Sequence, residues 1–463
     1  VRVLWTNGIP QNVRQPVARQ TVCSRQKLLK GSCPYLYVWN GKRYEFLTDC
    51  LWAAPIGLQL ADGILAPSRH EEFLKIPGDM LVPVDGEYRL QITEELWEAG
   101  YFDSVKLFAI DHPAEVDVYS NEKVGPAAIA TPKVHAVRKP RLPVAARDQT
   151  GRDVLPLIAK RDDVYLQSYD SRFTQGLTPE HFLELNLGKP GNPKRITLFL
   201  AGWVFPSDTS INVWLSHHPY LPAPQPPSVW VPDRNGEWKQ TIASMGFPGG
   251  KTKTIAVDLS KAFLTDDYRL RIKTTMELRW DAAFFTVDEG PSPYPMKEVP
   301  LKAARLFYRG FSRRIDRPHR APETYDFHTV DKTPHWPPMD GRFTRYGDVT
   351  PLVRGDDDIL VVMGAGDTLT LRFAVPEKPL PAGWKRDFFI RNVGWDKDAD
   401  LNTVLGQTTG PLPFRGMTGY PFPPGDSPPN SRDYQRYLRR YQTRKLPARR
   451  FWRSIQDFPA RTP

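Results

Sequence analysis

One short segment in the C-terminal quarter of the chain carries side chains that could bind a metal ion. Oxygen-bearing residues occupy alternate positions there, namely Asp396, Asp398, Asp400 and Asn402. Calcium binds about six to eight oxygen ligands, and this alternation can turn several carboxylates toward one point. However, Leu401 and Gln407 stand where calcium loops of this kind have glycine and glutamate. The segment therefore predicts either a calcium site or a polar turn in which the same side chains accept hydrogen bonds from nearby amides.

A second group of acidic residues consists of Glu94, Glu95 and Glu98. Two carboxyl groups about 5–10 Å apart across a substrate could hydrolyse a glycosidic bond. The sequence predicts no such geometry, and we expect these glutamates to lie on a solvated edge. The chain also lacks a nucleophile elbow, a phosphate-binding loop and the paired histidines of zinc enzymes. We therefore predict no catalytic residue, and calcium is the only cofactor for which the sequence offers ligands.

Two tryptophans are candidates for contact with a sugar. Trp230 and Trp238 stand on either side of a turn at residues 233–236, where their rings could be exposed. An exposed aromatic ring can stack on the apolar face of a sugar. Other tryptophans, including Trp203 and Trp214, fall within predicted strands, and we expect most of these rings to lie in the core.

The three cysteines all occur in the first fifty residues, at Cys23, Cys33 and Cys50. An odd number in so short a segment permits one disulfide and one free thiol. Cys33 could pair with Cys23 and close a small loop. It could also pair with Cys50, which would lie diagonal to it across the first predicted hairpin.

The positive charge of the chain is concentrated near its C-terminal end. The net charge is +11, but residues 431–453 contain nine arginines and lysines and one acidic residue, so the rest carries only +3. A nucleic-acid-binding domain normally spreads its charge over a folded face, so we predict no nucleic-acid partner. No apolar run approaches the ~20 residues that cross a bilayer, so no membrane-spanning segment is predicted.

Aromatic and β-branched runs separated by turns predict the elements that position these residues. The Asn-Gly pair at residues 40–41 predicts a two-residue hairpin turn that places Tyr37 opposite Tyr44. Similar short runs recur, including residues 164–169 and 211–215, which we expect to be strands. The 47 prolines disfavour long helices. The chain is therefore predicted to be mostly β, with antiparallel sheets.

The spacing of these strands predicts tandem β-sandwiches, followed by an irregular, proline-rich C-terminal region that ends in a short helix. The second sandwich resembles a galactose-binding-like jelly roll. Because a strand begins at the first residue, we also expect the chain to be part of a larger protein. The expected divisions are the tail of a preceding domain with a linker (1–30), the first sandwich (31–145), the second sandwich (150–300), a wrapping region of strands and coil (301–429), and a basic helix with a tail (430–463).

The predicted C-terminal helix has one apolar stripe on an otherwise basic surface. Its cap is expected at Asn430 or Ser431. The stripe suits docking on a folded surface, either of the chain itself or of another subunit. The residues expected to dock are Tyr434, Tyr437, Leu438 and Tyr441 of the stripe, at helical spacing, with Arg436 and Arg440 beside them.

Several short motifs occur along most of the chain, at residues 1–12, 33–49, 51–58, 202–203, 210–213, 344–349, 383–389 and 394–403. In these motifs the chain resembles the C-terminal region of large secreted bacterial proteins that carry FG-GAP repeats and an ASPIC/UnbV domain. The first of them is similar to the closing strand of ASPIC/UnbV. The resemblance covers about residues 1–450.

The resemblance implies an exported protein, extracellular or periplasmic at a bacterial cell surface, and it implies no activity. We therefore predict a non-catalytic binding or assembly module. Its partners would be other protein subunits, the upstream part of its own precursor, or cell-surface glycans. Two alternatives stay open, an accessory subunit of an exported enzyme or redox complex and a carbohydrate-active enzyme.

Overall fold

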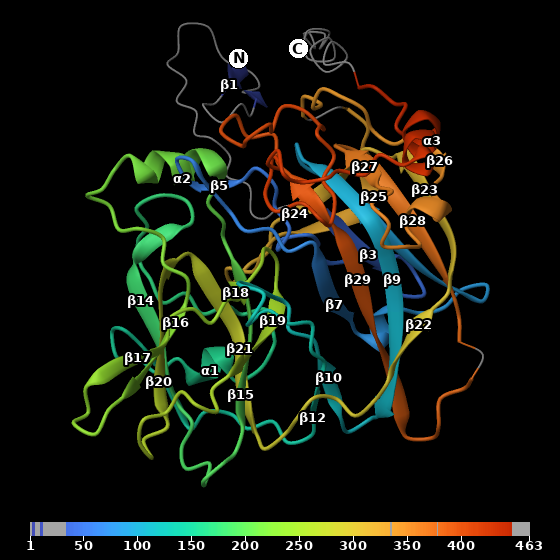
Figure 1. Cartoon of the computed structure of the whole chain (residues 1–463). Coiled ribbons are helices and arrows are strands. Elements are labelled where there is room, and N and C mark those ends of the chain that lie inside the picture. The colour runs from blue at the N-terminus through green and yellow to red at the C-terminus, as the bar shows by residue number, and fades with distance from the viewer. Residues whose placement is uncertain (1, 5–9, 13–33, 334–335, 377, 447–463) are drawn as a thin grey trace, which may run out of the picture.

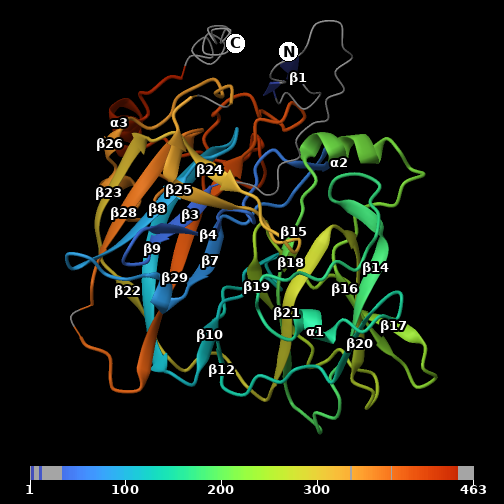
Figure 2. The same ribbon diagram turned by 180° about the vertical axis from the view of Figure 1, so that it is seen from behind.

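Two lobes built from antiparallel β-sheets stand side by side in the computed structural model (Figure 1), and the view from behind shows the same arrangement (Figure 2). The structure describes residues 2–4, 10–12, 34–333, 336–376 and 378–446. The first lobe contains residues 34–113 and 296–446, and the second contains the intervening residues. The prediction of a mostly β chain with antiparallel sheets and a short C-terminal helix is confirmed.

The first lobe is a sandwich of two sheets. One has the strand order β26-β23-β28-β8-β3-β4, and the other has the order β22-β9-β29-β7 with β27 also paired to β9. The first sheet consists of β3 (Tyr35–Trp39), β4 (Tyr44–Asp49), β8 (Glu87–Thr93), β23 (Leu301–Tyr308), β26 (Gly347–Asp348) and β28 (Asp367–Ala374). The second consists of β7 (Glu71–Ile76), β9 (Ala99–Pro113), β22 (Met296–Val299), β27 (Val361–Gly364) and β29 (Trp384–Lys397).

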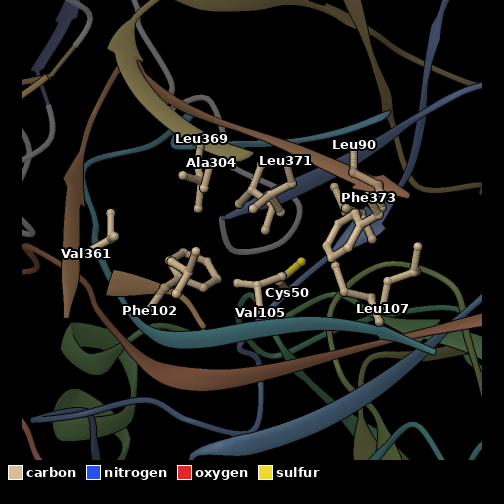
Figure 3. Packing of buried hydrophobic residues seen from close by; sticks show 14 of the residues in the cluster. Cys50, Leu90, Phe102, Val105, Leu107, Ala304, Val361, Leu369, Leu371 and Phe373 are labelled. Carbon is tan, nitrogen blue, oxygen red and sulfur yellow. The ribbon is translucent and has the colours of Figure 1, made fainter. Parts of the chain in front are cut away.

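Apolar side chains from the two sheets of the first lobe meet in a closed core (Figure 3). Leu371 and Phe373 of β28 point inward, and Phe102 and Leu107 of β9 face them. All four side chains are fully buried, as is the Cys50 thiol beside them. Burying one such large apolar side chain stabilises the fold by about 1.5–3 kcal/mol. This shared core makes the two sheets one folding unit.

The observed division of the first lobe differs from the predicted one. Residues 301–429, expected as an irregular region wrapped over finished sandwiches, instead supply β23, β28 and β29 to the first sandwich. β29 pairs with β9 along its whole length, and β28 lies between β8 and β23. Residues 31–145 alone therefore do not complete a sandwich. Local patterns predict strands, but they do not predict which distant strand becomes the partner.

The second lobe is also a sandwich, with sheets ordered β13-β14-β20-β16-β17 and β19-β15-β21. The first of these sheets contains β13 (Ala145–Asp148), β14 (Leu177–Asn186), β16 (Ser228–Pro232), β17 (Trp238–Ile242) and β20 (Arg269–Met276). The second contains β15 (Ile196–Val204), β19 (Lys253–Asp258) and β21 (Leu278–Val287). All eight strands lie within or beside the predicted second sandwich, residues 150–300.

Short elements connect and flank the two sandwiches. Residues 164–169, expected as a strand, form only an isolated bridge from Leu166 to Trp280. The paired strands are β1 (Arg2–Leu4) with β2 (Pro10–Asn12), β5 (Gln59–Ala61) with β6 (Ile64–Leu65), β10 (Asp117–Tyr119) with β12 (His135–Val137), β11 (Lys123–Val124) with β18 (Phe247–Pro248), and β24 (Phe311–Ile315) with β25 (Thr324–Asp331). Short helical turns are α1 (Leu155–Ile158), Gly78–Met80 and Thr350–Leu352.

The first predicted hairpin, β3 with β4, is present, but its register is shifted. Tyr44 was expected opposite Tyr37 and lies opposite Trp39 instead. The side-chain oxygen of Asn40 accepts a hydrogen bond from the amide of Arg43 at 2.9 Å, which closes a longer loop than the predicted two-residue turn. Such asparagine bonds to nearby backbone compete with tight hairpin turns.

The segment 211–215 forms a helix in place of the predicted strand. Helix α2 spans Thr209–Ser216, and the Asp208 side chain caps it by accepting a hydrogen bond from the Ile211 amide at 2.7 Å. Short apolar runs fit both periods, and here the cap decides for the helix. As a result Trp214, expected in the core, is 42% exposed.

The C-terminal helix begins where the sequence predicts. Helix α3 spans Arg432–Tyr441, and the Ser431 hydroxyl caps it by accepting a hydrogen bond from the Tyr434 amide at 3.1 Å. Among the residues that the structure describes, no helix combines the length and the apolar character that a membrane crossing needs.

The apolar stripe of α3 docks on the chain itself. Tyr437 and Tyr441 belong to the buried core of the first lobe, and the other two members of the stripe pack against it. Of the two sequence-based alternatives, the structure therefore shows docking in cis for the stripe. Arg436 and Arg440, which were expected to dock beside it, are exposed.

The Tyr437 hydroxyl is the polar anchor of this helix. It donates a hydrogen bond to the carbonyl oxygen of Leu360 at 2.8 Å and accepts one from the Gln442 side chain at 2.6 Å. Replacing Tyr437 by phenylalanine leaves these buried groups with fewer partners. We expect Tyr437→Phe to lower the free energy of unfolding by about 1–3 kcal/mol, measured by urea denaturation.

The matched control for this change is Tyr434→Phe on the same helix. Within the described part of the chain the Tyr434 hydroxyl makes no hydrogen bond, so the free energy of unfolding should change by less than about 0.5 kcal/mol. Equal losses in the two variants would show that the Tyr437 hydroxyl is not an anchor.

Buried ion pairs join the two lobes. Lys253, at the start of β19, pairs with Asp49 at the end of β4. Lys251 pairs with Glu323 of the first lobe at 2.5 Å, and its backbone amide also donates to the Asp49 carboxylate. All four side chains are at most 3% exposed. Gly250, with φ +68°, allows this approach because a side chain there would overlap the Asp49 carboxylate.

Breaking one of these pairs should be costly, because it leaves a buried charge without its counter-charge. We expect Lys251→Met to lower the free energy of unfolding by about 3–5 kcal/mol, measured by urea denaturation. The control is Lys160→Met, whose pair with Asp162 is solvent-exposed and should contribute less than about 1 kcal/mol. If both variants lose equally little, the Lys251–Glu323 pair does not hold the lobes together.

Candidate functional site

The residues of the predicted calcium loop do not converge on one point. The Asp398 carboxylate accepts hydrogen bonds from the Asp400 amide and the Thr403 hydroxyl, both at 2.7 Å. The Asp400 carboxylate accepts bonds from the Ser210 hydroxyl at 2.6 Å and from the Asn402 amide at 2.8 Å. These contacts form the polar turn that was the alternative to a metal site. They also attach the turn to α2 of the second lobe.

Asp396, the first residue of the alternating acidic pattern, belongs to a different cluster. Its carboxylate lies with those of Glu94 and Glu98, and one oxygen atom from each lies within 4.8 Å of the other two. Glu94 follows β8 directly, Glu98 precedes β9 directly, and Asp396 pairs with Gly100 across the β9–β29 ladder. The three carboxylates thus meet where the chain crosses from one sheet of the first sandwich to the other.

The expectation that Glu94, Glu95 and Glu98 lie on a solvated edge is wrong. Their side chains are buried, with relative exposures of 0%, 4% and 6%. The stretch between β8 and β9 reverses direction inside the lobe, so its polar residues are covered from both sheets. A run of acidic residues is usually solvated, and nothing local in this sequence indicates otherwise.

The electrostatic surroundings of the cluster are unfavourable to negative charge. Burial, and then the Glu98 carboxylate, raise the pKa of Glu94 well above its usual range. The same two causes, burial first, raise the pKa of Asp396. The neighbouring Lys397 does not offset this, because its ammonium group donates to the Tyr420 hydroxyl at 2.7 Å. Burial lowers the pKa of Lys397 to about 7.

Glu95, in the same loop, is a buried carboxylate that has both hydrogen-bond donors and a cationic partner. It accepts hydrogen bonds from the Ser312 amide at 2.7 Å and from the Thr93 hydroxyl at 2.9 Å, and its carboxylate lies 3.6 Å from the Arg309 guanidinium. The acidic residues of this loop therefore point in two directions. The Glu95 carboxylate lies beside the Arg309 guanidinium, and the carboxylates of Glu94 and Glu98 lie beside that of Asp396.

A large cleft lies at the junction of the two lobes. Its volume is about 1030 Å³, and residues of both lobes line it. Its basic lining residues are Arg43, Lys75, Lys160, Arg161, Lys251, Lys253 and Arg317, and its aromatic ones are Tyr44, Phe46, Tyr119, Phe284 and Tyr325. Four acidic residues also contribute, so the lining contains more basic than acidic side chains.

Most of the basic residues of the cleft already have acidic partners. Arg317 pairs with Asp163 at 2.9 Å, and the buried lysines form the junction pairs described above. Arg161 differs, because it is exposed and forms no ion pair or hydrogen bond with any residue that the structure describes. It is therefore the basic group of the cleft most available to a ligand.

Trp230 and Trp238 lie on the outer face of the second lobe, away from this cleft, on β16 and β17. Both rings are only partly exposed. The Arg271 guanidinium lies 3.9 Å from the centre of the Trp238 ring, and the Lys273 ammonium lies 4.3 Å from that of Trp230. A sugar that stacks on those faces would have to displace these cations. Sugar contact at these rings stays a prediction.

The cysteine predictions are decided only in part. Cys50 is a buried free thiol in the core of the first lobe, so the pairing of Cys33 with Cys50 is not formed. The alternative pairing, of Cys23 with Cys33, lies outside the described residues.

Comparisons with known proteins do not assign a function to these sites. The chain matches no protein-family model, no curated protein and no solved structure. The acidic cluster and the interlobe cleft are therefore interpreted from their own geometry and chemistry.

Proposed function

We propose that this chain is a non-catalytic binding module that holds an anionic carbohydrate in the cleft between its two lobes. The observation that carries the proposal is the lining of that cleft, where arginine and lysine side chains stand beside aromatic rings. Aromatic rings stack on sugars, and guanidinium and ammonium groups bind carboxylate or sulfate substituents. Concave sites between domains are also frequent places for ligands.

The acidic residues of the cleft support binding without catalysis. Hydrolysis of a glycosidic bond needs one carboxyl group free to give a proton and another free to assist from the opposite side. Here Asp326 pairs with Arg43 at 2.7 Å, and Asp163 pairs with Arg317. Glu122 accepts a hydrogen bond from the Thr254 amide, and Glu45 accepts one from the Asn40 side chain, both at 2.8 Å. These carboxylates hold the walls of the cleft in place.

The sequence and the structure also bear on where the module acts and on the kind of partner it binds. The resemblance to secreted bacterial proteins supports an extracellular or periplasmic location, where acidic surface glycans occur. Docking on a partner protein is less favoured, because the tyrosine stripe of α3 that suited such a contact is already buried against the first lobe. A glycan is therefore the ligand we favour.

The test is calorimetric titration of the full chain with a uronic-acid oligosaccharide, with neutral dextran of similar length as the uncharged probe. We expect binding of the acidic oligosaccharide only. Arg161→Glu, which reverses the charge of the available cation in the cleft, should raise the Kd by about tenfold, or about 1.4 kcal/mol. Added salt should weaken binding further.

The control is Arg439→Glu on α3, an exposed arginine outside the cleft that makes the same change in net charge. This variant should bind like the unmodified chain. Equal weakening in both variants would reveal a diffuse charge effect and no cleft site. Loss of binding in Trp230→Ala alone would move the site to the outer face of the second lobe.

A further inference from the structure

The buried acidic cluster of the first lobe carries a second inference, independent of the cleft. Glu94 is completely buried, and neither of its carboxylate oxygens has a partner in full hydrogen-bond geometry, although the nearby Gly100 amide favours its charged form. Asp396 is 7% exposed, and its Oδ1 also lacks a partner. Both carboxylates contribute an oxygen to the cluster that includes Glu98. A buried polar group without a partner costs about 1–3 kcal/mol, and a charged one costs more.

Among the described residues, no cation fills this role for Glu94 or Asp396. No ion pair among the described residues includes Glu94 or Asp396. Lys397 points to Tyr420, and Arg444 pairs with the neighbouring Asp367 at 2.5 Å. Elsewhere in this protein, buried carboxylates such as Asp49 and Glu323 each have a lysine partner. Glu94 and Asp396 thus lack the cationic partner that those two carboxylates have.

The backbone is shaped to let the carboxylates approach. Gly100, the second residue of β9, lies against Glu94, and a Cβ atom at that position would stand 2.1 Å from the Glu94 Oε1. Any other residue would push this carboxylate out of the cluster. Glycine inside a strand often marks such a close approach.

We propose that Glu94, Glu98 and Asp396 bind a divalent cation, with calcium the best match to their donor atoms. The site offers only carboxylate oxygens, which hard cations prefer and which zinc seldom uses alone. Calcium lies about 2.3–2.6 Å from its ligands, so oxygens on opposite sides of it are about 4.6–5.2 Å apart. The spacing within the cluster, at most 4.8 Å, fits that geometry.

The position of the site gives the cation a structural role. Glu94 leaves the sheet that contains β8, and Asp396 belongs to the sheet that contains β9 and β29. A cation bound between them joins the two sheets at one end of the sandwich. It also neutralises charge that would otherwise favour opening there. We expect calcium to stabilise the whole first lobe.

The experiment compares full-length protein freed of metal by a chelator with the same protein titrated with calcium chloride. Calorimetry should detect one site per chain, and the Tm should rise with calcium concentration. Asp396→Asn and Glu94→Gln should each weaken calcium binding by at least about tenfold and remove the rise in Tm. In the presence of chelator both variants should unfold at the same temperature as the unmodified chain or above it, because one buried charge is gone.

The matched control is Asp400→Asn, which belongs to the same alternating acidic segment but lies outside the cluster. It should keep the calcium-dependent rise in Tm. The proposal is overturned if the unmodified chain binds neither calcium, magnesium nor manganese at millimolar concentration. It is also overturned if Asp400→Asn loses calcium binding and Asp396→Asn keeps it, which would place the ion in the loop.

Discussion

The pairing of β9 with β29 is the constraint on which the rest of the structure depends. It joins residues 99–113 to residues 384–397 and so closes the first sandwich from two distant parts of the chain. β22, which returns from the second lobe, pairs with the same β9. The second lobe is therefore an insertion with both ends held near one strand. It stands beside the first lobe (Figure 1). The cleft is lined by residues of both lobes where they meet.

The two candidate sites follow from this arrangement through the treatment of buried charge. At the lobe junction, Lys251 and Lys253 neutralise Glu323 and Asp49. Both lysines form part of the lining of the cleft. At the crossover between sheets, the β9–β29 register brings Asp396 opposite Gly100 and beside Glu94. No lysine or arginine forms an ion pair with Glu94 or Asp396 among the described residues. In our proposals an anion therefore binds at the first site and a cation at the second.

Local features of the sequence predicted many of the strands and the cap of the C-terminal helix. The first hairpin, the β16–β17 hairpin of the second lobe and the Ser431 cap of α3 all rest on contacts between near neighbours in the chain. The errors arose where two local signals competed. At Asn40 a side-chain bond lengthened the turn, and at Asp208 a cap converted an apolar run into α2. Strand partners were missed because pairing joins residues far apart.

The sequence by itself determined a β-rich chain with a basic, tyrosine-striped helix, because periodicity, turn residues and caps act over a few positions. It also marked Asp396 as a possible metal ligand, within an alternating acidic segment. Only the tertiary structure decided that Asp396 meets Glu94 and Glu98 instead of Asp398 and Asp400. The physical reason is that burial and charge neutralisation depend on what packs around a carboxylate, and those neighbours come from strands that no local pattern connects.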